Sequence, residues 1–366
     1  NWTSYQGGNY YEVSGQIYDG AGIRRGAEFH VNSYVTGDQY QPQIVGTADG
    51  GFVTIWTSYN QDGSAEGVYG QRFDSNGNRL GTEFPINSYT TSSQYQPAAT
   101  ALEGGGFVAV WLSYLQDGSA EGVYGQRFDS NGTRIGAEFR ANTVTVSSQN
   151  QPTVTGLADG GFVVGWTSNL QDGNSYGIFG QRYDAAGNAV GSEFPINTYT
   201  PDEQSNVSLA ALADGGFMAS WQSNGQDGSG YGVYAQRFDA TGTRVGGEFR
   251  VNDVTAGSQF DAQVAARPDG GFMVAWTDAA NADDIYAKVF YASGMAPVLK
   301  ALDGAVGETS IVAASALLAP GHAQGDALVP GGLQILQRYE FLDQTIGGGH
   351  FTFNGVEQAA GQAFVV

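Results

Sequence analysis

GGFVAVW, residues 105–111, is the stretch that decides the fold, because its pattern Gly-Gly-Phe-x-x-x-Trp returns along the chain at a fixed interval of 55 residues. The tryptophans of the five copies are Trp56, Trp111, Trp166, Trp221 and Trp276. Trp2 is followed by Thr-Ser-Tyr, as Trp56 is, and so marks the end of a further copy. A fixed period of this length is typical of repeat architectures.

Four strand-like runs can be identified within one repeat, at residues 96–102, 106–111, 122–128 and 138–142. We name them strands A to D. Strands A and B are joined by a short Asp-Gly-Gly turn, as at 159–161, and strands C and D by Asp-x-x-Gly, as at 129–132. Such turns supply positions of positive φ that suit hairpins. Each repeat is therefore predicted to form a four-stranded antiparallel sheet.

Small sheets of this kind must bury both faces against neighbours, in a ring of blades or in a linear stack. We predict an all-β fold, a β-propeller of about six four-stranded blades in residues 1–294, followed by a small, partial β-sandwich-like module in 295–366. The predicted blades are 1–32, 39–87, 94–142, 149–197, 204–252 and 259–291. The first lacks an opening strand and the last a closing one, so we expect sequence upstream of Asn1 to help close the ring.

Composition limits the function. The chain has 366 residues, 36 acidic against 15 basic, a formal net charge of −21 and no Cys. This charge repels phosphates and excludes nucleic-acid binding. No apolar run reaches the roughly 18 residues of a membrane span, so no membrane insertion is expected. Acidity, tandem repeats and polar loops without Cys are typical of large proteins that bacteria export.

Two acidic sets recur. The Gln-Asp-Gly loops between strands B and C contain Asp62, Asp117, Asp172 and Asp227. In a closed propeller these carboxylates form a ring on one face, which suits calcium, the only cofactor that the sequence suggests. The alternative is that each Asp caps its own turn. The second set, Asp74, Asp129, Asp184 and Asp239 in the C–D turns, is predicted to form turns on the opposite face.

Arg and Glu recur at one offset on strands C and D, as Arg72 with Glu83, Arg127 with Glu138, Arg182 with Glu193 and Arg237 with Glu248. We predict a ladder of cross-strand ion pairs, since a catalytic pair has no reason to recur in every blade.

The repeated tryptophans end an apolar strand, so we expect most of each ring to be buried between blades, with the indole N–H bonded to a partner near the surface. Tyr59, Tyr69 and Tyr176 lie near the Gln-Asp-Gly loops and are the candidate ligand-binding aromatics, since exposed rings stack on sugars. Their role stays open at this stage.

No catalytic motif occurs: the three histidines are scattered, and neither Gly-x-Ser-x-Gly nor His-Glu-x-x-His is present. Carboxylates can still meet in space to hydrolyse glycosides. The divergent last blade, with Asp278, Asp283 and Asp284 in a shortened B–C loop, is the place to look for such chemistry.

The motif string Trp-x-Ser, Gln-Asp-Gly-Ser, Gly-Val-Tyr-Gly-Gln-Arg-Phe-Asp, Glu-Phe, Val-Asn resembles the tandem repeats of large secreted, RTX-type, calcium-associated surface proteins of Gram-negative bacteria, over residues 1–291. Residues 296–362 resemble the cadherin-like or Ig-like modules that follow such repeats. Only Asp326 remains of the calcium-ligating segment of those modules.

Three functions follow as hypotheses. The leading one is a non-enzymatic structural or adhesive module, extracellular or on the surface of a Gram-negative bacterium, that self-associates or contacts other surface components in a surface layer, filament, matrix or adhesin. The second is a lectin-like propeller that binds glycans. The third is a polysaccharide hydrolase or lyase that uses the divergent last blade.

Overall fold

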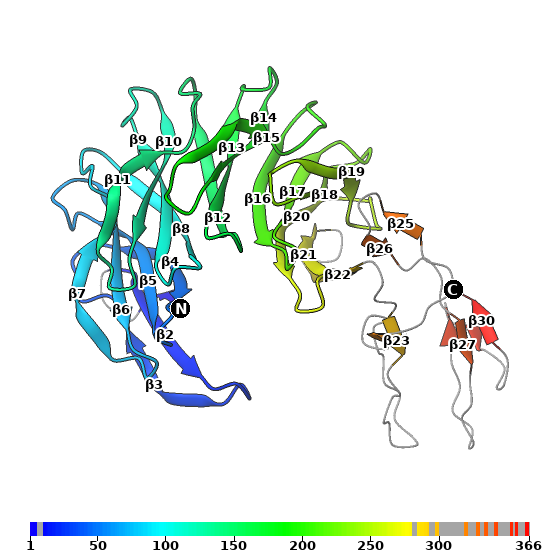
Figure 1. Cartoon of the computed structure of the whole chain (residues 1–366), viewed down its shortest axis with the longest axis horizontal. Helices are drawn as coiled ribbons and strands as arrows, with labels where there is room; N and C mark the ends of the chain where they lie inside the picture. Colours follow the sequence, from blue (N-terminus) through cyan, green and yellow to red (C-terminus); the bar gives the residue numbers. More distant parts are fainter. Residues whose placement is uncertain are drawn as a thin grey trace.

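The computed structural model describes residues 1–5, 10–279 and 284–292, together with the backbone of short strands between 297 and 365. The larger part is all-β and forms six antiparallel sheets (Figure 1). The first five are made only of strands that are consecutive in the chain, and the sixth also takes in two strands from the C-terminal part. Among the described residues, no helix has the length and apolar character needed to cross a membrane.

The strands of the six sheets are, in order, β1 (Trp2–Ser4), β2 (Glu12–Tyr18) and β3 (Arg24–His30); β4 (Gln39–Gly46), β5 (Phe52–Tyr59), β6 (Glu66–Phe73) and β7 (Arg79–Pro85); β8 (Gln94–Ala101), β9 (Phe107–Tyr114), β10 (Glu121–Phe128) and β11 (Arg134–Arg140); β12 (Gln149–Gly156), β13 (Phe162–Asn169), β14 (Tyr176–Tyr183) and β15 (Ala189–Pro195); β16 (Gln204–Ala211), β17 (Phe217–Asn224), β18 (Tyr231–Phe238) and β19 (Arg244–Arg250); β20 (Gln259–Ala266), β21 (Phe272–Asp278) and β22 (Asp284–Ala292).

The C-terminal strands are β23 (Pro297–Leu299), β24 (Leu318–Pro320), β25 (Ala327–Val329), β26 (Leu333–Ile335), β27 (Glu340–Leu342), β28 (Thr352–Phe353), β29 (Val356–Glu357) and β30 (Ala363–Val365). β26 pairs with β22 at Tyr291 and Ala292, and so takes the place beside β22 where no strand D was evident. The rest of the predicted cadherin-like or Ig-like module, 295–366, lies outside the described residues.

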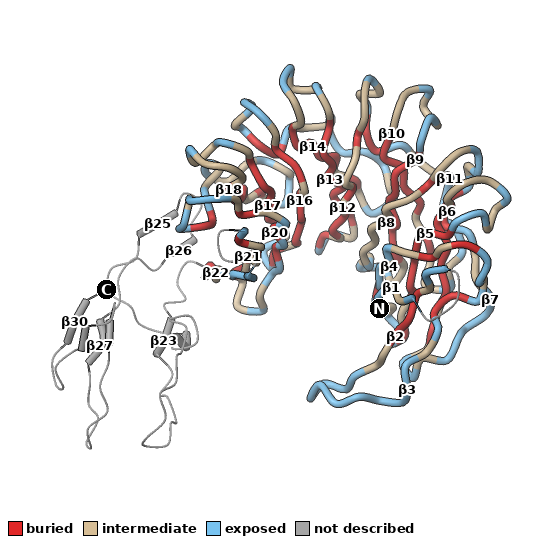
Figure 2. Tube along the Cα trace, turned by 180° about the vertical axis from the view of Figure 1, so that it is seen from behind, coloured by how far each residue is buried: buried red, intermediate tan, exposed pale blue. Residues whose placement is uncertain are grey.

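The six sheets are the blades of a β-propeller, as predicted. They follow an arc around a common centre, with the first and sixth at its ends (Figures 1 and 2). Strand A of each blade lies on the concave side, where β4, β8, β12, β16 and β20 contact one another in turn. Burial is concentrated between the blades (Figure 2).

Strand D differs from the prediction. β11 spans Arg134–Arg140 rather than 138–142, because Gly136 adopts a φ of 73° and the pairing with β10 shifts register between Gly125 and Arg127. This β-bulge interrupts the alternation from which the strand was predicted. Asn142 then lies beyond the strand.

Aromatic rings fill the space between blades. Phe107 and Phe128 of the third blade stack with ring centroids 4.7 Å apart, and Phe84 of the preceding blade lies 6.0 Å from Phe128. The same trio recurs at every interface between described blades. Such pairs stabilise beyond the area they bury.

The tryptophans were predicted correctly in one respect and wrongly in another. Trp56, Trp111, Trp166 and Trp221 are fully buried, and Trp276 is 7% exposed. However, the indole Nε1 atoms of the first four are buried without a hydrogen-bond partner among the described residues. The ring lies wholly within the interface, so its N–H does not reach the surface.

A buried amide pair connects each blade to the next. Asn87 Oδ1 accepts from the Val68 N–H of its own blade (2.7 Å), and Asn87 Nδ2 donates to the Tyr89 carbonyl (2.8 Å) and to Gln94 Oε1 of the next blade (3.2 Å). Gln94 Nε2 donates to the Thr91 carbonyl (3.0 Å). Both side chains are at most 2% exposed. We refer to this arrangement as the Asn–Gln clamp. The clamp residues of the four further junctions between described blades are Asn32 with Gln39, Asn142 with Gln149, Asn197 with Gln204 and Asn252 with Gln259.

The predicted Arg–Glu ladder is wrong. The bulge in strand D places Arg72 opposite Leu80, not opposite Glu83. Arg72 instead pairs with Asp49 of the A–B turn at 3.5 Å. Likewise Arg182 pairs with Asp159 and Arg237 with Asp214, while Arg127 donates to the Ala185 and Ala186 carbonyls of the next blade.

The glutamates of that ladder bind the preceding link between blades. Glu138 Oε2 accepts from the N–H and the hydroxyl of Ser88 (2.7 and 2.8 Å), and its Oε1 from Gln116 Nε2 (2.7 Å). Glu83, Glu193 and Glu248 make equivalent contacts with Ser33, Thr143 and Thr198. Arg134, four residues before Glu138, donates to the carbonyls of Pro85 and Asn87 (2.9 and 2.8 Å). Arg79 and Arg244 make the same contacts as Arg134, so three links are held at both their N–H and carbonyl groups from the following blade, whereas Ala189 stands at the arginine position of the fourth blade.

We expect Asn87→Ala to lower the free energy of unfolding by about 2 to 4 kcal/mol, because the buried Val68 N–H and the Gln94 side chain lose their partner. Urea denaturation followed by tryptophan fluorescence measures this. Asn131→Ala, which truncates an exposed amide in a C–D turn, is the matched control and should stay within about 0.5 kcal/mol of the parent. Equal effects of the two changes would contradict the clamp.

Candidate functional site

Strands A of the middle blades line a concave groove that contains three cavities of about 480, 430 and 390 Å³. The first lies where strands A and C begin, and the second lies midway along strands A. These two share Gln96 and Gln151 and together form what we refer to as the central groove. The third is lined by the A–B turns. Volumes of this size suit small ligands.

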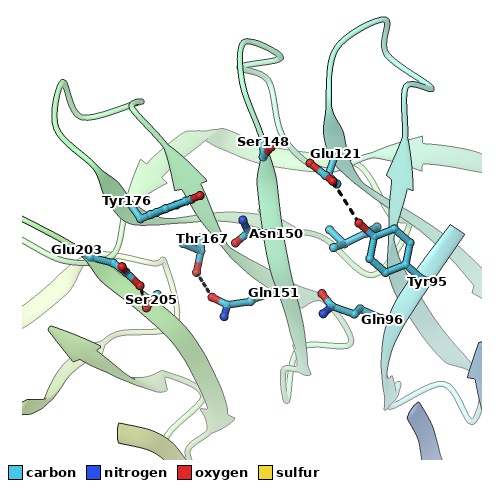
Figure 3. Close-up of a pocket in the computed structure, with 11 residues that line it drawn as sticks. Tyr95, Gln96, Glu121, Ser148, Asn150, Gln151, Thr167, Tyr176, Glu203 and Ser205 are labelled. Carbon is cyan, nitrogen blue, oxygen red and sulfur yellow. Dashed lines mark hydrogen bonds between the residues drawn. The ribbon is translucent and has the colours of Figure 1, made fainter. Parts of the chain in front are cut away.

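The first cavity brings together residues of three blades (Figure 3). They are Tyr95, Gln96, Leu112, Glu121, Ser148, Asn150, Gln151, Thr167, Tyr176, Glu203 and Ser205. The second is lined by Gln41, Gln43, Gln96, Pro97, Ala98, Gln151, Pro152, Thr153, Asn206, Val207, Ser208, Asp261 and Gln263. Amides, hydroxyls and carboxylates therefore dominate the lining.

Tyrosine and glutamate are paired at the mouth of the first cavity. The Tyr95 hydroxyl donates to Glu121 Oε1 at 3.2 Å (Figure 3). Burial, reinforced by the Glu121 charge, raises the pKa of Tyr95 to about 12. Glu203 accepts from the Ser205 hydroxyl at 2.7 Å, and burial together with the Glu203 charge raises the pKa of Tyr231. These tyrosines therefore remain hydrogen-bond donors at neutral pH.

An uncommon backbone conformation recurs in the groove. The third residue of strand A has a positive φ in five blades, at Gln41 (54°), Gln96 (51°), Gln151 (51°), Asn206 (56°) and Asp261 (54°). We refer to these residues as the amide belt. Each lies at a register shift between strands A and B, where an extra residue bulges toward the groove.

This conformation costs energy in three of the five blades. A left-handed conformation costs an L-residue roughly 1–2 kcal/mol, and it is rarer still before proline, which follows Gln41, Gln96 and Gln151. Asn206 and Asp261 are of the residue types that tolerate it, and no proline follows them. Strain of this kind persists where the surroundings impose it and is concentrated at functional sites.

Two belt amides are fixed by their oxygen atoms. Gln151 Oε1 accepts from the Thr167 hydroxyl (2.8 Å) and from the Asn206 N–H of the next blade (3.0 Å). Gln41 Oε1 accepts likewise from Thr57 (3.3 Å) and from the Gln96 N–H (3.2 Å). Leu112 occupies the corresponding place in the third blade. The side-chain amide of Gln96 has no hydrogen-bond partner in the described part of the chain.

The Gln-Asp-Gly aspartates cap their own loops, which is the alternative that the sequence left open. Asp62 Oδ1 accepts from the Ser64 N–H at 3.0 Å. Likewise, Asp117, Asp172 and Asp227 each accept from the backbone N–H two residues further along the chain. Asp62 Oδ2 lies against Gly67, where an added Cβ would be 2.8 Å away. This contact explains the glycine at that position of each repeat.

The predicted calcium ring does not fit the donor set. Across the described residues, no three His, Cys, Asp or Glu side chains are grouped as metal ligands would be. The aspartates belong to four separate loops, and calcium takes about six to eight oxygens. Beside the buried Oδ2 of Asp117, the buried atoms without a partner include one further oxygen of the loop, Gln116 Oε1, and a donor, Trp111 Nε1. Two side-chain oxygens in one loop are fewer than the oxygens that calcium takes.

The three candidate tyrosines lie in different settings. Tyr176 lines the first cavity (Figure 3). Tyr59 is 42% exposed at the end of β5, outside the residues that line the groove. Tyr69 is only 9% exposed, in the interface with the first blade, so it is not a stacking surface. The second acidic set forms turns as predicted: Asp74 Oδ1 accepts from the N–H groups of Asn76 and Asn78 at 2.8 Å.

Sequence reasoning missed the amide belt and the Tyr95–Glu121 pair. The signal was present, since Gln-x-Gln-Pro recurs at 39–42, 94–97 and 149–152. From the sequence alone, this motif indicates only where strand A begins. A Gln before proline is ordinarily extended, so the bulge could not be inferred locally.

No protein-family model matches the sequence, and comparison with curated proteins gives no match. Among solved structures, a protein of unknown function from Dyadobacter fermentans is similar, with a TM-score of 0.49 and 12% identity over 69% of this chain and 78% of that one. An α-L-arabinanase of Penicillium chrysogenum in complex with arabinobiose gives 0.48 and 13% over 67% and 78%. The α-L-arabinofuranosidase Arb93A of Fusarium graminearum gives 0.45 and 12% over 69% and 92%. The fold assignment therefore rests on the strand order and blade contacts of this chain itself.

Alkaline pH is expected to destabilise the groove. The pKa of Tyr95 is raised from 10.0 to about 12 in the folded chain, so its contribution to stability is complete below pH 10 and is lost as pH rises toward 12. The melting temperature of wild type should fall between these pH values, and that of Tyr95→Phe should fall less. Thermal melting across this range measures it, with Asn131→Ala as the control that follows the wild-type curve. Identical declines for Tyr95→Phe and wild type would contradict the assignment.

Calcium is expected to leave stability unchanged. A ligand that binds only the folded chain raises the melting temperature as its concentration increases, and the loops do not offer such a site. Melting in chelator and in millimolar calcium should therefore coincide within about 1 °C. A concentration-dependent rise that Asp117→Asn abolished and Asp129→Asn preserved would restore the calcium hypothesis.

Proposed function

We propose that this chain is a non-enzymatic, extracellular structural or adhesive module of a large bacterial surface or secreted protein, which binds its partners through the central groove. One observation carries the proposal: the charged residues that recur in the repeats are engaged in the frame of the propeller, either within their own blade or at the preceding link. The carboxylates of Glu83, Glu138, Glu193 and Glu248 all bind the preceding link. Residues that differ between blades lie at the mouth of the groove.

One position at the mouth of the groove differs in most blades. The second residue of strand A is Tyr40, Tyr95, Asn150, Ser205 and Phe260 in successive blades, whereas the clamp Gln just before it never changes. A uniform frame with a varied inner surface is the arrangement expected of a binding platform. It suits a module that displays one surface for contact.

The setting of the module is proposed from composition and resemblance. A net charge of −21 without Cys, together with the repeat string that resembles RTX-type proteins, supports the proposal that the chain is extracellular or on the surface of a Gram-negative cell. Other surface components or further copies of the chain are the partners proposed for a layer, filament, matrix or adhesin.

A glycan-binding, lectin-like propeller is the second candidate, and the lining of the central groove favours it. Amides, tyrosines and carboxylates face one cavity of about 480 Å³. Sugar hydroxyls need both donors and acceptors, and this lining supplies both.

A polysaccharide hydrolase or lyase is the remaining alternative. In the last blade, Asp278 is 2% exposed and lies opposite Asp284, while Asp283 lies outside the described residues. Glu121 and Glu203 both line the first cavity, on opposite sides of it (Figure 3). Two carboxylates in one cavity are the minimum for glycoside hydrolysis, so turnover must be measured directly.

The purified chain is expected to be retained on Gram-negative cells and on their extracted surface polysaccharide without releasing reducing sugar, because its repeated carboxylates are engaged in structure. Co-sedimentation and a reducing-sugar assay over a day measure the two properties. Sugar release that Glu121→Gln and Glu203→Gln abolish would show an enzyme in the groove. Release abolished instead by Asp283→Asn and Asp284→Asn would place the enzyme in the last blade.

A further inference from the structure

The amide belt presents fixed hydrogen-bond donors to the central groove. The oxygen atoms of Gln41 and Gln151 are held by a threonine and by the backbone of the next blade. Their Nε2 groups have no partner in the described part of the chain. Holding the oxygen orients the amide, so the N–H groups are presented to a ligand at little further entropic cost.

Gln96 lies between them with a wholly unpaired amide. It lines both cavities of the central groove, and its neighbour Tyr95 points toward the same space (Figure 3). Gln96 can therefore both donate and accept. Together with Asn206 and Asp261, the belt forms a row of polar groups across five adjacent strands.

The charge of the groove selects the ligand. The charged residues among those described in its lining are Glu121, Glu203 and Asp261, and they include no Lys or Arg. The groove is acidic and the whole chain has a net charge of −21, so polyanions are repelled. Peptide recognition uses deep apolar or aromatic anchor pockets, whereas amides and hydroxyls line this groove. Carboxylates that accept and amides that donate match neutral sugar hydroxyls.

Resting on the binding function proposed above, we propose that the amide belt is a carbohydrate-binding site that holds a neutral oligosaccharide along the central groove, with Gln96 and Gln151 donating to sugar hydroxyls and Glu121 accepting from one. The strained Gln-Pro conformation serves to project these amides from the inner strands into the groove.

The strain supplies a test that separates binding from folding. Gln96→Gly removes the amide and at the same time relieves the positive φ. This variant is expected to melt at the same temperature as wild type or higher, while binding at least about tenfold more weakly, the change expected for one lost hydrogen bond to a ligand. Gln96→Asn keeps an amide and tolerates the conformation, so it should retain part of the affinity. Asn131→Ala is the matched amide truncation outside the groove and should bind as wild type does.

The probes are cellohexaose, laminarihexaose and mannohexaose, with oligogalacturonate as the acidic comparison, all measured by calorimetry on the full chain. Binding of at least one neutral hexasaccharide that Gln96→Gly weakens supports the site. The proposal is overturned if the chain binds none of the three, if it prefers oligogalacturonate, or if Gln96→Gly binds as tightly as wild type. Retention on cells that persists when all three neutral probes fail would leave the adhesive function standing and refute only the site. Cleavage of a bound hexasaccharide would leave the carbohydrate-binding site standing and refute the non-enzymatic function.

Discussion

The fold depends on the way one blade is tied to the next through buried amides. Blade interfaces bury aromatic rings, but aromatic contacts are not directional enough to fix the angle between sheets. The clamp supplies the direction: Asn87 bonds to the backbone of its own blade and to Gln94 of the next, in surroundings where an unpaired amide is costly. Because the same geometry recurs at each junction, the blades turn in one sense by similar steps, and an arc results rather than an irregular stack.

This mode of connection decides which residues are free to function. Glu138 and Arg134 bind the N–H and carbonyl groups of the preceding link, and the turn aspartates bind their own backbone. Charged residues that repeat are thus structural. At the concave ends of strands A, the clamp Gln and the side-chain oxygens of Gln41 and Gln151 join neighbouring blades. The position between them differs from blade to blade, with Tyr95, Asn150 and Ser205 in the middle blades. Stability and recognition are therefore assigned to separate positions of one repeat.

Much of the fold could be predicted from sequence, and less of the site. The 55-residue period, the turns and the buried tryptophans follow from patterns that each repeat carries in full. The Arg–Glu ladder failed because Gly81 and Gly136 introduce bulges, which shift the facing residue without changing the local composition. The groove was missed for a related reason: the positive φ of Gln96 is imposed by neighbouring blades against its local preference, so only the assembled propeller reveals it.

The same conflict between local preference and tertiary context indicates why the belt is placed where it is. A regular strand A would direct alternate side chains into the blade interfaces, and the groove would present little more than backbone and small residues. The bulge at Gln96 turns an additional amide inward, at the cost of a strained residue next to Pro97. In the fifth and sixth blades Asn206 and Asp261 adopt that conformation at lower cost, yet the middle blades keep the longer Gln. Relief of the backbone strain alone would favour Asn or Gly at all five positions. Gln is nevertheless kept in three neighbouring blades, where Tyr95, Tyr176 and two glutamates line the groove. A side chain that must extend far enough to contact a ligand would explain this choice.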